Sequence, residues 1–121
     1  MRNTLYEELT KDTSTLGLSI NEIAYIVKSW GEDRQFDTPT SLKTREERIL
    51  MNEKLMLVVT EVAEACEALR KLDIDEMEFE LADVVIRVLN LAGSLGIDLD
   101  KRIADKMEIN RGRPIKHGKD C

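Results

Sequence analysis

The stretch EFELADVVIRVLNLAGSLGIDL, residues 78–99, decides the fold because it is one long apolar segment with a single narrow polar face. A helix advances about 100° per residue, so each position can be assigned a direction around the helix axis. The remaining circumference is apolar, which predicts a helix that is buried on most of its sides. A lone four-helix bundle cannot easily cover such a helix, so we expect further copies of the chain to cover it. The polar side chains fall within an arc of roughly 80° and are Glu76, Glu80, Asp83, Arg87, Asn90 and Ser94.

Start and stop signals predict further helices on both sides of this segment. Ser19 with Glu22 and Thr44 with Glu47 each form the pattern of a capping box, in which two side chains satisfy free N–H groups at a helix start. The first of these helices is expected to end near Gly31. The expected helices cover about residues 19–30, about 44–72, from a cap at Asp75 to the region of Gly93–Gly96, and about 99–110.

Length and composition agree with one small domain over residues 1–121, with residues 111–121 as a basic C-terminal tail. Apolar residues make up 42% and charged residues 35%, a balance that favours a soluble helical domain, so we expect an all-α four-helix bundle. The net charge of −6 argues against a protein that coats a nucleic acid polymer. No apolar run approaches the roughly 18 residues of a membrane span, and the first residues lack a signal-peptide core. We therefore expect no membrane partner and a cytoplasmic location.

Two pairs of carboxylates stand one helical turn apart on consecutive helices: Glu61 with Glu64, and Glu80 with Asp83. The turn between these helices is only a few residues long, so the helices should lie side by side and antiparallel, and the four carboxylates can converge. Acids brought together in a partly dry groove repel each other unless a cation neutralises them. A solvated polar strip is the alternative interpretation for the first pair, and it is the favoured one for Glu67 on the same face.

Oxygen ligands without His or Cys suit Mg²⁺, or Mn²⁺ in its place, rather than zinc. Cys66 lies inside a helical pattern and Cys121 is the last residue, so the cysteines form neither a metal-ligand spacing nor a disulfide framework. A di-iron bundle would need E-x-x-H ligands, and the only histidine is His117 in the tail. The sequence therefore predicts a magnesium site.

A carboxylate-held Mg²⁺ usually binds substrate phosphates, so the chain should also supply cations to hold them. From residue 101 to residue 121 there are seven Lys or Arg against three acids, which indicates a phosphate clamp or, alternatively, a solvated basic end. The only tryptophan, Trp30, fits a stacked base and a core position equally well. The candidate substrate contacts on these grounds are Trp30, Lys54, Arg87, Lys106, Arg113, Lys116 and His117.

The segments EVAEACEAL, EFELADVVIRVLNLAGSLGIDL and NRGRPIKHGK resemble the MazG-like branch of the all-α nucleoside triphosphate pyrophosphohydrolases over roughly residues 50–119. The order E-x-x-E then E-x-x-D is specific in combination. The resemblance implies a site completed by assembly into a homodimer or homotetramer. It also implies Mg²⁺-dependent hydrolysis of a (deoxy)nucleoside triphosphate to the monophosphate and pyrophosphate, in the manner of a nucleotide-pool house-cleaning enzyme. The metal ligands and the further substrate contact that it implies are Glu61, Glu64, Glu80 and Asp83, and Asn90.

One departure from the family concerns the catalytic base. Many relatives begin the first motif with two consecutive glutamates, whereas Thr60 stands at the first of these positions here. Glu61 or Glu64 would then act with the metal to deprotonate the attacking water. Two alternatives of other classes stay open: a helical homo-oligomeric interaction module without chemistry, and a nucleotide sensor that binds a triphosphate without hydrolysing it.

Overall fold

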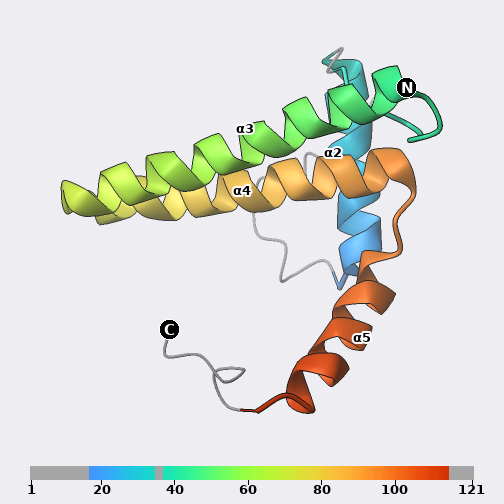
Figure 1. Cartoon of the computed structure of the whole chain (residues 1–121). Coiled ribbons are helices and arrows are strands. Elements are labelled where there is room, and N and C mark those ends of the chain that lie inside the picture. The colour runs from blue at the N-terminus through green and yellow to red at the C-terminus, as the bar shows by residue number, and fades with distance from the viewer. Residues whose placement is uncertain (1–16, 35–36, 115–121) are drawn as a thin grey trace.

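The computed structural model describes residues 17–34 and 37–114, and these residues form four helices and no strand (Figure 1). The all-α prediction is therefore confirmed. The helices are α2 (Ile20–Asp33), α3 (Arg45–Arg70), α4 (Ile74–Leu95) and α5 (Leu99–Arg111).

Both predicted capping boxes are present, and they set the starts of α2 and α3. Ser19 Oγ accepts a hydrogen bond from Glu22 N at 3.1 Å, and the Glu22 carboxylate accepts one from Ser19 N at 2.9 Å. Thr44 and Glu47 make the same reciprocal pair at 3.1 and 2.9 Å. Each box satisfies two N–H groups that a helix start would otherwise leave unpaired.

The predicted end of α2 near Gly31 falls slightly short, because the helix continues to Asp33. A glycine in a helix interior costs about 1 kcal/mol relative to alanine, and tertiary packing can outweigh that cost. Gly31 is buried here, and the carbonyls of Trp30 and Gly31 accept hydrogen bonds from Arg34 N at 3.1 and 3.2 Å. The loop to α3 therefore begins later than the sequence pattern indicates.

The predicted cap of α4 at Asp75 is also wrong, because Asp73 caps the helix and α4 begins at Ile74. Leu72 adopts a left-handed conformation with φ of 58°, which ends α3 and reverses the chain at once. Asp73 then lies where its carboxylate accepts a hydrogen bond from Glu76 N at 3.1 Å. The turn between α3 and α4 is therefore short, which lets the two helices lie antiparallel.

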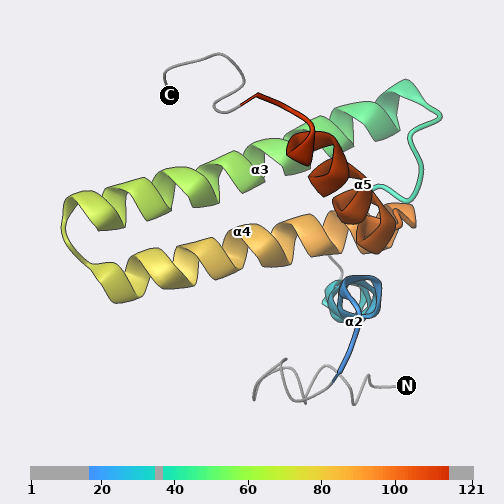
Figure 2. The same ribbon diagram turned by 90° about the horizontal axis from the view of Figure 1, so that it is seen from below.

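Helices α3 and α4 run antiparallel and side by side as a long hairpin, as predicted, and α2 crosses the end of α4 (Figures 1 and 2). The crossing depends on Gly93, because a Cβ at this position would lie 2.5 Å from the Ala24 carbonyl oxygen and 2.9 Å from Lys28 Cβ. No side chain fits at such a distance. Gly93 therefore lets α2 approach the half of the hairpin that carries the pocket described below.

Helix α5 turns away from the hairpin and is joined to the start of α2 by a network of side chains. The Asp100 carboxylate accepts hydrogen bonds from Ile20 N and Asn21 N, both at 3.1 Å. Asn21 in turn donates to Asp98 Oδ1 at 2.7 Å, so the starts of the two helices are tied together. No residue of α5 is buried. Helix α5 lies apart from the α3–α4 hairpin (Figure 1).

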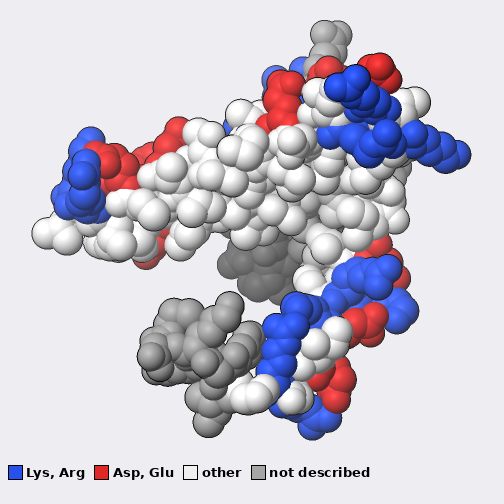
Figure 3. All heavy atoms as spheres, in the orientation of Figure 1, with Lys and Arg blue, Asp and Glu red and all other residues white. Residues whose placement is uncertain are grey.

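A large apolar surface of the hairpin is exposed in the single chain. Phe79 is 69% and Val85 55% exposed on α4, and Val59 is 54% exposed on α3. Figure 3 shows mostly uncharged atoms over α3 and α4, with charged side chains gathered toward the ends of the hairpin. The chain alone therefore does not bury α4 on most of its sides. Across the residues that the structure describes, no helix is both long enough and apolar enough to span a membrane.

Candidate functional site

Three glutamates converge where α3 and α4 lie side by side. Glu61 and Glu64 stand one turn apart on α3, and Glu80 reaches them from the neighbouring turn of α4. One carboxylate oxygen of each lies within 4.8 Å of the others. Glu61 and Glu80 are buried, whereas Glu64 is exposed. Two of the three carboxyl groups thus sit where water cannot screen them well, so they interact strongly.

The pKa values of Glu61 and Glu80 are shifted in opposite directions. A hydrogen bond shared with Glu61, followed by contact with Glu76 and by burial, raises the pKa of Glu80 to about 8. The pKa of Glu61 is lowered, first by the shared hydrogen bond with Glu80 and then by the Arg87 guanidinium, whose Nε donates to Glu61 Oε1 at 2.9 Å. Glu61 is therefore the charged member of the pair and Glu80 holds the proton at neutral pH.

The second carboxylate oxygen of Glu80 is buried and has no hydrogen-bond partner among the described residues. A buried carboxylate oxygen without a partner is costly, and it needs a cation or a donor to offset that cost. The surrounding donor set consists of carboxylate oxygens only, which suits a hard divalent ion such as Mg²⁺. The residues of the cluster therefore fit the predicted metal, with Glu61, Glu64 and Glu80 as the side chains that could hold it.

A pocket of about 740 Å³ adjoins the cluster through Glu61, the one glutamate of the three that lines it. Its walls come from α2, α3, α4 and the loop between α2 and α3, so it combines segments that are far apart in the sequence. Pockets that bind small molecules pair apolar walls with a few polar groups, and this pocket has both. Its lining residues are Val27, Trp30, Asp37, Thr38, Lys54, Glu61, Asp83, Ile86, Arg87 and Asn90.

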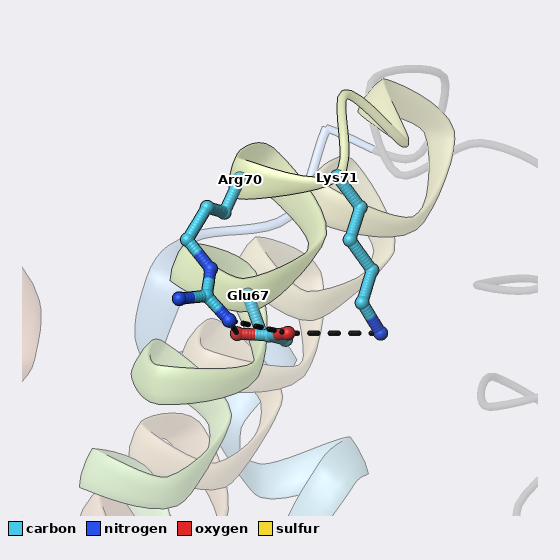
Figure 4. Close-up of polar contacts among 3 residues, drawn as sticks. All are labelled: Glu67, Arg70 and Lys71. Atoms are coloured by element: carbon cyan, nitrogen blue, oxygen red, sulfur yellow. Dashed lines mark hydrogen bonds and ion pairs between the residues drawn. The ribbon is translucent and has the colours of Figure 1, made fainter.

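The four predicted metal ligands are only partly brought together. Glu61, Glu64 and Glu80 form one group, whereas Asp83 lines the pocket outside that group and is exposed. Glu67 lies one turn beyond Glu64 and takes no part. Its carboxylate accepts hydrogen bonds from Arg70 Nη2 at 2.8 and 3.0 Å, and the Lys71 ammonium lies 3.6 Å away (Figure 4). The interpretation of Glu67 as a surface residue fits this geometry.

The predicted substrate contacts divide into three groups. Trp30, Lys54, Arg87 and Asn90 all line the pocket. Lys106 and Arg113 are exposed and are not among the described residues that line it, because α5 points away from the hairpin. The role of Lys106 and Arg113 in substrate binding stays a prediction, both in the single chain and in an assembly of several chains. Lys116 and His117 lie outside the described residues.

Sequence reasoning missed the contribution of the α2–α3 loop. Asp37 and Thr38 line the pocket together with the apolar side chains of Val27 and Ile86. No local motif marks Asp37 or Thr38. Pro39 indicated a loop here, but only the tertiary contacts of that loop bring its residues to the pocket.

The comparison with known families agrees with this geometry. The MazG nucleotide pyrophosphohydrolase domain model matches residues 51–113, just over half of the chain, and the match includes all three converging glutamates and Asp83. Neither the curated proteins nor the solved structures contain a significant match. The resemblance stated from the sequence motifs is thereby confirmed. Because the family model covers more than half of this all-α chain, including the acidic residues of both antiparallel helices, the chain belongs to the MazG nucleotide pyrophosphohydrolase family.

Proposed function

We propose that the protein hydrolyses a nucleoside or deoxynucleoside triphosphate to the monophosphate and pyrophosphate with Mg²⁺, or with Mn²⁺ in its place. One observation carries the proposal: the buried, unpartnered oxygen of Glu80 lies within a cluster of carboxylates beside a pocket with apolar and cationic walls. The cluster suits a divalent ion and the pocket suits a nucleotide. Membership of the family supports the same class of reaction.

Glu61, Glu64 and Glu80 would hold the ion, and Asp83, which lines the adjoining pocket, would join them. The bound ion would supply charge that orients the phosphate oxygens and lowers the pKa of the attacking water. Arg87 and Lys54 line the same pocket, where their cations would bind the β- and γ-phosphates and stabilise the charge that develops on them. The bound ion and the two cationic side chains would then act on the same triphosphate group.

We assign the general base to Glu64. The hydrogen bond with Glu80 and the guanidinium of Arg87 keep the pKa of Glu61 low, which makes Glu61 a poor base. Glu64 is exposed and so remains accessible to a water molecule. In the reaction the water proton passes to Glu64 and the water oxygen bonds to the α-phosphorus. The bond between that phosphorus and the bridging oxygen breaks, and pyrophosphate leaves.

The nucleoside would occupy the end of the pocket near Asn90. Asn90 is seven residues after Asp83 on α4, which places it about 10 Å farther along the helix axis. The apolar side chains of Val27, Trp30 and Ile86 line the pocket, where they could contact a base. The phosphates would then lie toward the carboxylates and the base toward α2 and the α2–α3 loop.

We further propose that the protein assembles as a homodimer or homotetramer through α3 and α4. The exposed side chains Phe79, Val85 and Val59 would form part of such an interface, because monomers rarely leave so large an apolar surface in water. Size-exclusion chromatography with light scattering gives the molar mass of the assembly directly. A mass of one chain at micromolar concentration would contradict the assembly.

The decisive experiment follows both the products and the position of attack. The protein is incubated with Mg²⁺ in H₂¹⁸O and a panel of ribo- and deoxyribonucleoside triphosphates. We expect pyrophosphate and a monophosphate that carries the ¹⁸O, because the water attacks the α-phosphorus. Orthophosphate as the only phosphate product, or ¹⁸O in the pyrophosphate, would reject the reaction proposed.

Two variants give the experiment its internal controls. Glu64→Gln should lose turnover, whereas Glu67→Gln, on the same helix but paired with Arg70 and Lys71, should keep it. The rival functions make different predictions. A nucleotide sensor would bind a triphosphate and release nothing, and an interaction module would show neither binding nor a change of melting temperature with millimolar Mg²⁺.

A further inference from the structure

Ser94 is the last polar residue on the polar face of α4, and it lies too far along the helix to touch the carboxylates. It is 14 residues after Glu80, which corresponds to about 21 Å along the helix axis. Its side chain is buried, with 8% of the residue exposed. A buried hydroxyl in an apolar helix is costly unless it is hydrogen-bonded, so its partners identify its role.

The partners of Ser94 belong to the loop between α2 and α3. Ser94 Oγ donates a hydrogen bond to the Pro39 carbonyl oxygen at 2.6 Å and lies 3.2 Å from Thr38 Oγ1. These residues are 55 and 56 positions away in the sequence. Pro39 is itself buried. Ser94 therefore fastens this loop to the end of α4.

Different contacts hold the two halves of the loop. Toward α3, Ser41 Oγ donates to the Glu47 carboxylate, and Arg48 donates to the carbonyl oxygens of Leu42 and Lys43, both at 3.0 Å. These bonds fix the second half to the start of α3. Among the side-chain hydrogen bonds of the described residues, those made by 38–39 go to Ser94.

The half that Ser94 holds is the half that lines the pocket. Thr38 is one of the two loop residues in the pocket wall, and Asp37 directly precedes it. Asn90, one turn before Ser94 on α4, lines the same pocket. The position of this wall relative to α4 thus depends on the hydrogen bond at Ser94.

We infer that Ser94 is a positioning residue for the nucleoside part of the substrate: it holds Asp37 and Thr38 at the pocket without touching the substrate itself. The inference rests on the proposed hydrolysis of nucleoside triphosphates. Loss of the hydroxyl leaves the Pro39 carbonyl buried without its donor, so the loop shifts or opens to find another one. Binding of the nucleoside weakens, while the carboxylate cluster about 21 Å away keeps its geometry.

The test compares Ser94→Ala with Ser41→Ala, a matched removal of a hydroxyl that holds the other half of the same loop. For Ser94→Ala we expect the KM of a nucleoside triphosphate to rise about ten-fold, with kcat changed by less than about two-fold. The inhibition constant of inorganic tripolyphosphate, which has no nucleoside, should stay within about two-fold of the wild type. Ser41→Ala should leave all three constants unchanged.

Further measurements separate positioning from a purely structural role. Hydrogen exchange should become faster in the peptide that contains 37–40 in Ser94→Ala, and Ser94→Thr should restore both exchange and KM. Ser94→Cys fills nearly the same space but is only a weak hydrogen-bond donor. It should therefore show the same rise in KM, and it replaces Ser94→Ala in the test if the Ser94→Ala protein folds poorly.

Each outcome has a distinct meaning. An unchanged KM in Ser94→Ala and Ser94→Cys, or equal losses for the triphosphate and for tripolyphosphate, would overturn the role of Ser94 while the proposed function stands. A wild-type protein that releases no pyrophosphate would instead refute the proposed function, and the role of Ser94 with it.

Discussion

Binding of Mg²⁺ or Mn²⁺ should expel the proton that Glu80 holds in the metal-free protein. The proton is present because the bond with Glu61 and the other nearby acids raise the pKa of Glu80 to about 8. A divalent ion among these oxygens favours the charged carboxylate, so the ion and the proton compete for the same group. Metal affinity is therefore linked to pH.

The size of the effect follows from the pKa of about 8. A carboxyl with this pKa is about nine-tenths protonated at pH 7 and about one-tenth protonated at pH 9. Metal binding should thus release about 0.9 proton at pH 7 and about 0.1 at pH 9. The dissociation constant of the metal should fall about ten-fold between pH 6 and pH 7 and level off above pH 8.

Isothermal titration calorimetry measures both quantities. The apparent binding enthalpy of Mn²⁺ in buffers with different ionisation enthalpies gives the number of protons released at each pH. Glu80→Gln should bind the ion more weakly and release no proton. Glu67→Gln, whose carboxylate is paired with Arg70 and Lys71 outside the cluster, should behave as the wild type. Tight binding by the wild type at pH 7 without proton release would refute the reasoning.

Three further results are expected. In EDTA, the contribution of Glu80 to stability is fully present below pH 4.5 and is lost as the pH rises toward 8. The free energy of unfolding in urea should therefore fall over this range. Glu80→Gln should flatten the fall. Asp83→Asn should keep its helical circular dichroism but lower kcat/KM about a hundred-fold or more, and a variant with normal turnover would exclude Asp83 from the site. Gly93→Ala should destabilise the fold by about 1–3 kcal/mol, because its Cβ would meet the Ala24 carbonyl oxygen at 2.5 Å. Gly112→Ala, where the nearest atom is 3.6 Å away, is the matched control, and equal urea midpoints for the two variants would contradict the close approach of α2 and α4.

Local patterns predicted most of the helices because their signals lie within a few residues of each other. The capping boxes of α2 and α3 need only a spacing of three residues, and both are present. Local signals misplaced two helix boundaries, the start of α4 and the end of α2. Asp73 rather than Asp75 caps α4 because Leu72 reverses the chain immediately, and α2 passes Gly31 because that glycine is packed in the interior.

The position of the acids could also be anticipated, because helical periodicity and a short turn bring Glu61, Glu64 and Glu80 to the same side of an antiparallel pair. Periodicity did not distinguish Asp83, one turn away on the same arc, which lies outside the three-carboxylate group. Nor did it indicate that Arg87 would bond to Glu61, since that contact joins residues 26 positions apart on different helices.

The amino-acid sequence by itself determined an all-α chain, the antiparallel hairpin and the family, because these depend on helical period, capping and motif order. Only the tertiary structure decided which residues surround the pocket. The bond from Ser94 to Pro39 brings the α2–α3 loop to it, and the bonds of Asp100 to the start of α2 direct α5 and its basic residues elsewhere. Both contacts span 55 or more residues, and no local pattern encodes contacts over such distances because they form only when the helices pack.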